Sequence, residues 1–208
     1  MTLWAIVPVK PLRRGKSRLA AALSLAEREA LGRALLTRTL GTLRACEHVA
    51  VTLVVSHDLQ ALALARRCGV RTIGEGRKAP LNRSLDAAAR TARRFGAHAV
   101  LVLPADLPLL SGEDLEALAA QADEPPVAAI APDRRGAGTN ALLLSPPGLI
   151  EYAFGTDSYA VHRARARAAG ARVEVIDLPG LRLDLDLPED LELLRAARST
   201  VLPERLME

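Results

Sequence analysis

Short apolar runs and longer segments of helical periodicity alternate along the whole chain. The short runs are rich in Val, Ile and Leu and are bounded by turn-forming residues, a pattern that predicts strands. The predicted strands lie near residues 3–7, 50–56, 70–73, 98–103, 127–131, 140–144 and 172–176. Strands and helices in alternation predict an α/β fold, a three-layer Rossmann-like domain with a mainly parallel central sheet and helices on both faces.

Local signals mark where several predicted helices begin and end. Ser24 and Glu27 form a capping box, in which the serine hydroxyl and the acid each accept a main-chain N–H. Ser111 opens another helix, whose first turn is acidic. Gly96 and Gly170 fit the C-terminal ends of helices, because glycine adopts a left-handed backbone at little cost.

The composition is that of a globular domain. Half of the 208 residues are hydrophobic, enough to bury a core, and we expect one domain over residues 1–208. No apolar run approaches the roughly 20 residues that span a bilayer, so we expect a cytoplasmic protein with no membrane partner. Cys46 and Cys68 are expected to be reduced. The four histidines lack the spacing of metal ligands.

The positive charge surplus does not point to nucleic acid. The net charge is +4, but the arginines are scattered among acids along the predicted helices, and only five residues are aromatic. We therefore expect no nucleic-acid partner, whereas a modest surplus suits an enzyme that handles several phosphates. Of the three lysines, Lys10 and Lys16 share one loop and Lys78 lies in another. Either this placement is due to chance or these loops need the compact point charge of a lysine.

The segment Val7–Ala20, VPVKPLRRGKSRLA, contains a Gly-Lys-Ser that is typical of a phosphate-binding P-loop. That motif needs a glycine five positions before Gly15, and this position is Lys10. Two prolines also remove main-chain N–H donors from the segment. We therefore predict a different arrangement, in which an anion is held partly by the side chains of Lys10, Lys16 and Arg18.

Aspartates are found at two places where ligands of a parallel sheet gather. Asp106 follows the predicted strand 98–103, and the carboxyl ends of such strands form the usual binding edge. Asp184 and Asp186 are two apart in an extended run, so their carboxylates project from one face. Adjacent like charges usually need a cation or a basic partner between them, and oxygen ligands beside a phosphate-bearing substrate suit Mg²⁺. The alternatives are a turn aspartate at 106 and a solvated edge strand at 184–186.

Two further segments offer anion-binding groups. DRRGAGTN, residues 133–140, joins two predicted strands and presents glycine N–H groups and the hydroxyl of Thr139. FGTDSY, residues 154–159, leads into a helix, so Gly155 and Ser158 lie at a helix N-terminus that favours an anion. An ordinary helix cap is the alternative for Ser158 or Asp157. Together with the basic loop and the aspartates, these features indicate nucleotidyl transfer from a magnesium-bound triphosphate.

The chain resembles the 2-phospho-L-lactate or phosphoenolpyruvate guanylyltransferases of deazaflavin-coenzyme biosynthesis. The resemblance runs from Trp4 to Leu191 and rests on the segments WAIVPVKPLRRGKSRL, LPADLPLL, GTNALLL, FGTDSYAVH and LDLDLPEDL in that order. It implies the GT-A-like nucleotidyltransferase fold. It also implies transfer of GMP from GTP to a small phospho-acid with release of pyrophosphate, and it favours phosphoenolpyruvate over 2-phospholactate and 3-phosphoglycerate.

The resemblance implies a role for each matching residue. The expected catalytic residues are Lys10, Lys16 and Asp106. The expected ligands of magnesium, with two ions, are Asp106, Asp184 and Asp186. The acceptor would be held by Thr139, Gly155 and Ser158. The nucleotide would be held by Val7, Pro8, Val9, Lys16, Ser17, Arg18, Asn82, Pro104 and Ala105. Relatives commonly have Gly-Leu-Asn where this chain has Pro80-Leu81-Asn82, which changes the backbone near the expected base contact.

Other functions remain open at this point. One alternative is a nucleotidyltransferase of the same fold that uses CTP or UTP, or a molybdopterin acceptor, although molybdopterin-type relatives carry a Gly-Gly pair that the first loop lacks. Another is a non-catalytic nucleotide-binding module, which retention of all three candidate metal aspartates argues against. A homodimer is compatible with the sequence.

Overall fold

The computed structural model describes residues 2–13, 15–76 and 79–196. Lys78 and the end of the chain beyond residue 196 lie outside the described residues. The strands within these ranges are β1 (Leu3–Pro8), β2 (Val49–Ser56), β3 (Arg71–Gly74), β4 (Ala99–Val102), β5 (Val127–Pro132), β6 (Thr139–Ser145) and β7 (Arg172–Val175). All seven strands expected from the sequence are therefore present, within one or two residues of their predicted ends.

The strands form one sheet in the order β3-β2-β1-β4-β6-β5-β7. The pairs β1–β2, β1–β4, β2–β3 and β5–β7 are parallel, whereas β6 is antiparallel to both of its neighbours. This mainly parallel sheet confirms the predicted α/β architecture. The reversal of β6 brings its first residue, Thr139, to the edge where the other strands end, because Thr139 pairs with Pro132 at the end of β5.

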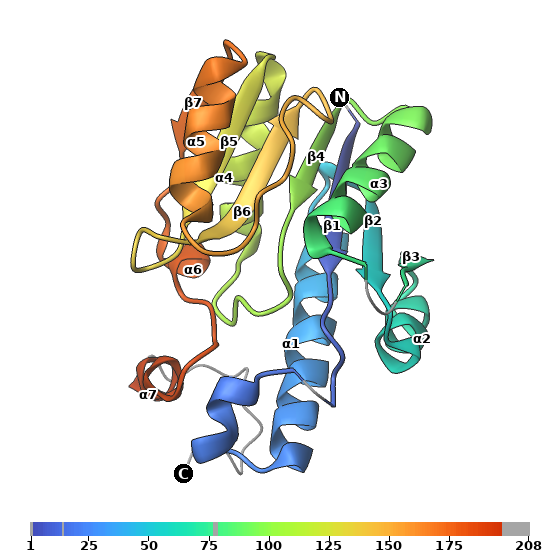
Figure 1. Cartoon of the computed structure of the whole chain (residues 1–208). Helices are drawn as coiled ribbons and strands as arrows, with labels where there is room; N and C mark the ends of the chain where they lie inside the picture. The colour runs from blue at the N-terminus through green and yellow to red at the C-terminus, as the bar shows by residue number, and fades with distance from the viewer. Residues whose placement is uncertain (1, 14, 77–78, 197–208) are drawn as a thin grey trace.

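Helices cover both faces of the sheet (Figure 1). They are α1 (Leu25–Ala45), α2 (Leu59–Arg67), α3 (Leu81–Arg94), α4 (Gly112–Ala119), α5 (Ser158–Ala168), α6 (Pro179–Arg182) and α7 (Pro188–Ala196), with 3-10 turns η1 (Ser17–Ala21) and η2 (Ala120–Asp123). Both sides of the capping box at Ser24 are formed, and so is a second box at Ser111. Gly96 and Gly170 have φ of 84° and 68°, as expected for helix ends.

The core is divided by the sheet. Along β1, Leu3, Ala5 and Val7 pack with α1, α2 and α4, while Trp4 and Ile6 pack with α3 and α5 on the opposite face. This alternation follows from the two-residue period of a strand buried on both faces. A third cluster joins η1, α1 and α7 beyond the sheet edge.

None of the helices in the described ranges has the length and apolar character needed to cross a bilayer.

The binding edge lies where the strands of the parallel sheet end. In Figure 1 this is the lower edge, where the loop after β1, the turn after β4 and the segment between α6 and α7 converge. The third cluster holds η1 and α7 against the lower end of α1, so the segments on either side of this edge are fixed by buried leucines rather than by charges alone. Cys46 and Cys68 are free thiols, in agreement with the sequence.

Candidate active site

Lys16 and Asp106 meet at this edge although they are 90 positions apart in the chain. Lys16 Nζ donates to Asp106 Oδ2 at 2.8 Å. The two residues follow β1 and β4, which are neighbouring parallel strands, so their loops leave the sheet side by side. Lys16 has a φ of 55°, and a left-handed backbone at a non-glycine residue is characteristic of constrained functional loops.

The environment of Asp106 combines opposing effects on its pKa. Burial by itself would raise the pKa of this carboxyl, but the charge and hydrogen bond of Lys16, with a further contribution from Lys10, lower it below its usual value. Only 12% of the Lys16 side chain is exposed, so solvent screens the pair weakly. Asp106 is therefore a stable carboxylate at neutral pH.

The segment that carries Asp184 and Asp186 is joined to Asp106. The main-chain N–H of Leu185 donates to the main-chain oxygen of Asp106 at 2.9 Å, which ties the two segments together. Leu183 and Leu185 are buried in the third cluster, so the alternation expected from the sequence is present. Asp186 accepts a hydrogen bond from Arg18 NH1 at 2.9 Å, although 68% of the Arg18 side chain is exposed.

The pKa of Asp184 is shifted in the opposite direction from that of Asp106. Burial raises it, and the negative charge of Asp106 raises it further. The folded protein thus holds two carboxylates near each other, and their repulsion costs free energy when both are ionised. We name Lys16, Arg18, Asp106, Asp184 and Asp186 the charged group.

The charged group fits a magnesium ion only with help from the substrate. Within the described residues, no three acidic, histidine or cysteine side chains are already placed to hold a metal ion together. Mg²⁺, however, is usually bound by one or two carboxylates together with phosphate oxygens and waters. The proximity that raises the pKa of Asp184 places two oxygen donors, on Asp106 and Asp184, where a cation would relieve their repulsion.

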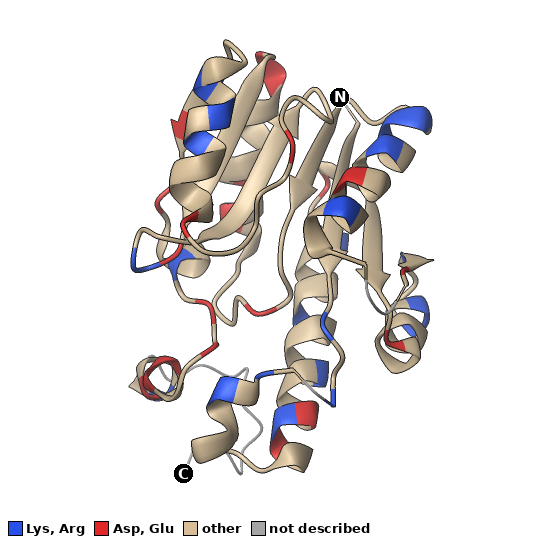
Figure 2. Cartoon of the chain, viewed as in Figure 1, with Lys and Arg blue, Asp and Glu red and all other residues tan. Residues whose placement is uncertain are grey.

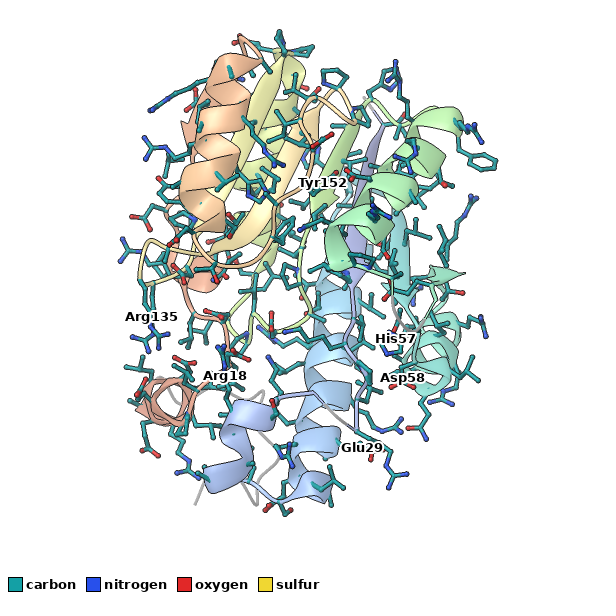
Figure 3. The ribbon with its side chains drawn as sticks, viewed as in Figure 1. Arg18, Glu29, His57, Asp58, Arg135 and Tyr152 are labelled. Atoms are coloured by element: carbon teal, nitrogen blue, oxygen red, sulfur yellow. The ribbon has the colours of Figure 1, made fainter. Side chains whose placement is uncertain are left out.

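A hollow of mixed charge lies beside the charged group. It is lined by Arg18, Asp133, Arg134, Arg135, Asp184, Asp186, Leu187 and Asp190. In Figure 2, the segments around this edge carry both blue (Lys, Arg) and red (Asp, Glu) positions, and in Figure 3 Arg18 lies on η1 beside α7, with Arg135 on the hairpin above α7. Arg134, in the hairpin between β5 and β6, donates to Asp190 Oδ1 at 2.8 Å.

Asp190 is a structural residue in the first turn of α7. Its Oδ2 accepts the main-chain N–H groups of Asp186 and Leu187 at 3.0 and 2.7 Å. These bonds and Arg134 lower the pKa of Asp190, against the effect of its burial, which alone would raise it. Asp190 therefore fixes the backbone that carries Asp186.

The predicted acceptor residues lie near the start of α5. Ser158 is the first residue of α5 and is buried, and Gly155 has a φ of 140° that few residues other than glycine adopt. Asp157 precedes the helix but forms no side-chain capping bond. Thr139 is buried at the start of β6, and its Oγ1 lies 3.0 Å from Nδ1 of His162, which is in α5.

The β5–β6 hairpin connects these residues with the charged group. The N–H of Tyr159 donates to the oxygen of Ala137 at 3.1 Å, which holds α5 to the hairpin. On its other side, the N–H of Arg134 donates to the oxygen of Arg182 at 2.9 Å, just before the segment that carries Asp184. The hairpin therefore lies between the predicted metal ligands and the predicted acceptor residues.

The side chain of Asn82 is hydrogen-bonded to the main chain of Phe154. Its amide nitrogen donates to the oxygen of Phe154 at 3.1 Å, and its amide oxygen accepts the N–H of Phe154 at 2.8 Å. This bidentate link fastens the first turn of α3 to the residue before Gly155. We name Thr139, Ser158, His162 and Asn82 the neutral group. Contact between Asn82 and a purine base remains a prediction.

The other expected nucleotide-binding residues line the strand ends. Val7 is fully buried and Val9 nearly so, which leaves the main chain of these residues as the part that could contact a ligand. Pro8, Pro104 and Ala105 are partly exposed, and Lys10 and Ser17 are exposed. Val7 and Pro8 are the last residues of β1 and Ser17 begins η1, whereas the others lie in the loops after β1 and β4.

Two buried residues near the site, His162 and Asn140, were not among those expected from the sequence. Ser158 and His162 are four positions apart, the spacing that places two residues on one face of a helix, and this was the signal available for His162. Asn140 is buried, and its amide donates to the oxygens of Leu181 and Arg182 at 2.9 and 3.1 Å. These two hydrogen bonds depend on tertiary contacts that a local sequence pattern does not encode.

Nearly the whole chain matches one known protein family. Residues 3–199 match the family model described as "Guanylyl transferase CofC like". The chain belongs to this family. As a member of the CofC-like family, it is 44% identical over 200 residues to a phosphoenolpyruvate guanylyltransferase of Rubrobacter xylanophilus, with 95% of each chain covered. A protein of the same name from Sphaerobacter thermophilus is 41% identical, with 92% of each chain covered.

The fold of this CofC-like chain is shared with solved nucleotidyltransferases. A protein from Desulfovibrio desulfuricans G20 described as a nucleotide-diphospho-sugar transferase superposes with a TM-score of 0.80 and 18% identity, covering all of this chain and 94% of the other. A nucleotidyl transferase from Methanothermobacter superposes with a TM-score of 0.69 and 18% identity, covering 94% and 97% of the two chains. The predicted nucleotidyltransferase fold is therefore confirmed.

Proposed function

We propose that this chain transfers GMP from GTP to phosphoenolpyruvate and releases pyrophosphate, as a step of deazaflavin-coenzyme biosynthesis in the cytoplasm. The relatives named phosphoenolpyruvate guanylyltransferase support the substrates, since two of them are 44% and 41% identical over nearly the whole chain. The observation that carries the proposal is the ion pair of Lys16 and Asp106, which lies next to Asp184. A lysine suited to phosphate and two carboxylates suited to a metal ion are thus close together at one sheet edge.

The reaction needs charge compensation more than proton transfer. An oxygen of the phosphoenolpyruvate phosphate forms a bond to the α-phosphorus of GTP, and the bond from that phosphorus to the oxygen shared with the β-phosphate breaks. The attacking oxygen is already anionic at neutral pH, so no strong general base is required. The barrier lies in bringing two polyanions together, which calls for positive charge and accurate positioning.

Three cations of the first loop supply this charge in the proposal. Lys10, Lys16 and Arg18 would contact the triphosphate, and Lys16 would move part of its interaction from Asp106 to phosphate oxygens. Ser17 and the main chain from Val7 to Val9 would lie along the nucleotide, together with Pro104 and Ala105. Asn82 would contact the base or hold the loop that does so.

Magnesium would be held by Asp106 and Asp184, with Asp186 beside them. Bound there, it would neutralise charge that develops on the phosphates during transfer. The three carboxylates would keep this side of the edge negative, and Asp106, which accepts from Lys16, would hold that lysine in reach of the substrate until the triphosphate binds. Thr139, Gly155 and Ser158 would hold the phosphate and carboxylate of the acceptor at the N-terminus of α5.

A substrate panel tests the proposal. Purified protein with Mg²⁺ is assayed for pyrophosphate release with GTP, ATP, CTP and UTP, each against phosphoenolpyruvate, 2-phospholactate and 3-phosphoglycerate. Release with GTP and phosphoenolpyruvate, abolished by a chelator, is expected. Turnover of CTP or UTP but not GTP would instead favour another nucleotidyltransferase, and salt-sensitive binding to arbitrary DNA without any turnover would remove the enzyme interpretation. Sedimentation of the same preparation tests the expected homodimer.

A further inference from the structure

His162 is enclosed by two polar neighbours that fix its protonation. The side chain is completely buried, and its Nε2 lies 2.9 Å from the main-chain nitrogen of Ala153. A main-chain N–H can only donate, so Nε2 must accept and carries no proton. The ring proton of the neutral histidine is therefore on Nδ1, which faces Thr139.

This tautomer decides the direction of the next hydrogen bond. Nδ1 is 3.0 Å from Thr139 Oγ1, so the ring donates and the hydroxyl accepts. A threonine hydroxyl has a single hydrogen, and that hydrogen cannot also point at a protonated Nδ1. In the part of the chain that the structure describes, this hydroxyl forms no second hydrogen bond, so its hydrogen is available to a ligand.

We propose that His162 is a positioning residue that keeps the Thr139 hydroxyl oriented as a hydrogen-bond donor toward the anionic acceptor. The inference rests on the proposed function for the identity of that acceptor, a small phospho-acid. Thr139 would then donate to its phosphate or carboxylate beside the N-terminus of α5. A threonine without this partner could also turn its hydroxyl to accept, which would repel an anion.

The surroundings of His162 keep the ring neutral, as this role requires. Burial, and then the charge of Arg165, lower the pKa of His162 to about 4. The ring of Phe154 packs edge-on against the imidazole with centroids 5.0 Å apart. A protonated ring would place a second N–H against that of Ala153, so the neutral form is also the one that the hydrogen bonds allow.

The first test measures the tautomer without reference to activity. A long-range ¹H–¹⁵N correlation spectrum of the ligand-free protein at neutral pH, assigned to His162 by comparison with His162→Asn, should show protonated Nδ1 and unprotonated Nε2. Protonated Nε2 would overturn the proposal. This readout does not depend on the reaction, so it separates a failure of the proposed function from a failure of this inference.

The second test asks whether the histidine acts through Thr139. His162→Leu should raise KM for phosphoenolpyruvate by roughly tenfold or more, the effect of losing a hydrogen bond to a charged group, and leave KM for GTP within about twofold. Thr139→Val should give the same pattern, and the double variant should be no worse than either single one. His162→Asn, whose amide can place a donor near the Nδ1 position, should recover part of the loss.

A merely structural histidine would give different kinetics. The two single substitutions would then have independent effects that multiply in the double variant, and KM for both substrates or kcat alone would change. That result would overturn the proposal even if the tautomer were as expected. If the His162 variants do not fold, the spectrum still decides, because the His162 signals can be assigned by elimination after substitution of His48, His57 and His98.

Discussion

The charged group and the neutral group lie on either side of the β5–β6 hairpin and are built in different ways. In the charged group, side chains 90 and 168 positions apart form ion pairs at 2.8 and 2.9 Å. In the neutral group, the uncharged side chains are buried or partly buried, and directional hydrogen bonds fix those of Asn82, Thr139 and His162 to main chain or to one another. Under the proposed function, the two groups are two solutions for handling anions at one sheet edge.

The difference has a physical reason. Ion pairs can exchange partners, so lysine and arginine side chains can leave aspartates for phosphate oxygens when a triphosphate binds. A small acceptor must instead be oriented, because its attacking oxygen has to face one phosphorus atom. Fixed hydrogen-bond donors without net charge orient a small anion. They also lack the long-range attraction that would draw the triphosphate to the acceptor side of the site.

The largest expected effect is on catalysis through the charged group. Asp106→Asn should lower kcat on the order of 10³-fold in the pyrophosphate-release assay, because a metal-binding carboxylate and the partner of Lys16 are lost together. Asp177→Asn is the matched control, since Asp177 forms an exposed ion pair with Arg182, and its kcat should stay within about twofold. A near-normal rate for Asp106→Asn would reduce Asp106 to a structural role.

Substitution of two aspartates at the same edge should change the free energy of unfolding in opposite directions. Asp190→Asn should lower the free energy of unfolding by about 2 kcal/mol, because the carboxylate that accepts from Arg134 and two main-chain N–H groups loses its charge. Asp184→Asn should raise it by roughly 0.5–1 kcal/mol in chelator, because folding disfavours the ionised form of this residue. Urea unfolding of both variants makes the comparison, and a loss of stability in both would contradict the assignment.

The neutral group should give the protein a pH dependence through His162. The pKa of this residue falls from 6.5 to about 4 on folding, so between these values the unfolded chain binds more protons than the folded one. Stability contributed by neutral His162 is therefore present above pH 6.5 and lost as the pH falls toward 4, at up to about 1.4 kcal/mol per pH unit. The slope of unfolding free energy against pH should be shallower in His162→Asn. Equal slopes would mean that the ring is not held neutral.

The smallest effect distinguishes two roles for Asn82. If its amide serves mainly to hold Phe154 beside Gly155, Asn82→Ala should raise KM for phosphoenolpyruvate by roughly twofold to tenfold, the effect of neutral hydrogen bonds. The preference for GTP over ATP should then be unchanged. A loss of that preference would instead place Asn82 at the base, as the sequence suggested.

Local patterns predicted much of the fold, since strands, helix ends and the capping box at Ser24 each depend on a few neighbouring residues. The basic loop and the aspartates were also found, because loops after parallel strands share one edge. The bonds of His162 and Asn82 were not predictable in this way. They depend on the main chain of Ala153 and Phe154, and their positions follow from how β6, α3 and α5 pack.

The most direct test of the central claim, that separate groups handle the two anions, is a calorimetric titration of GTP with Mg²⁺ into Lys16→Met and Thr139→Val. Lys16 pairs with Asp106 in the charged group, whereas Thr139 contacts His162 in the neutral group. Lys16→Met should weaken GTP binding by roughly tenfold or more, and Thr139→Val should leave it within about twofold of the unmodified protein. Equal weakening in both variants, or no change in Lys16→Met, would contradict the claim.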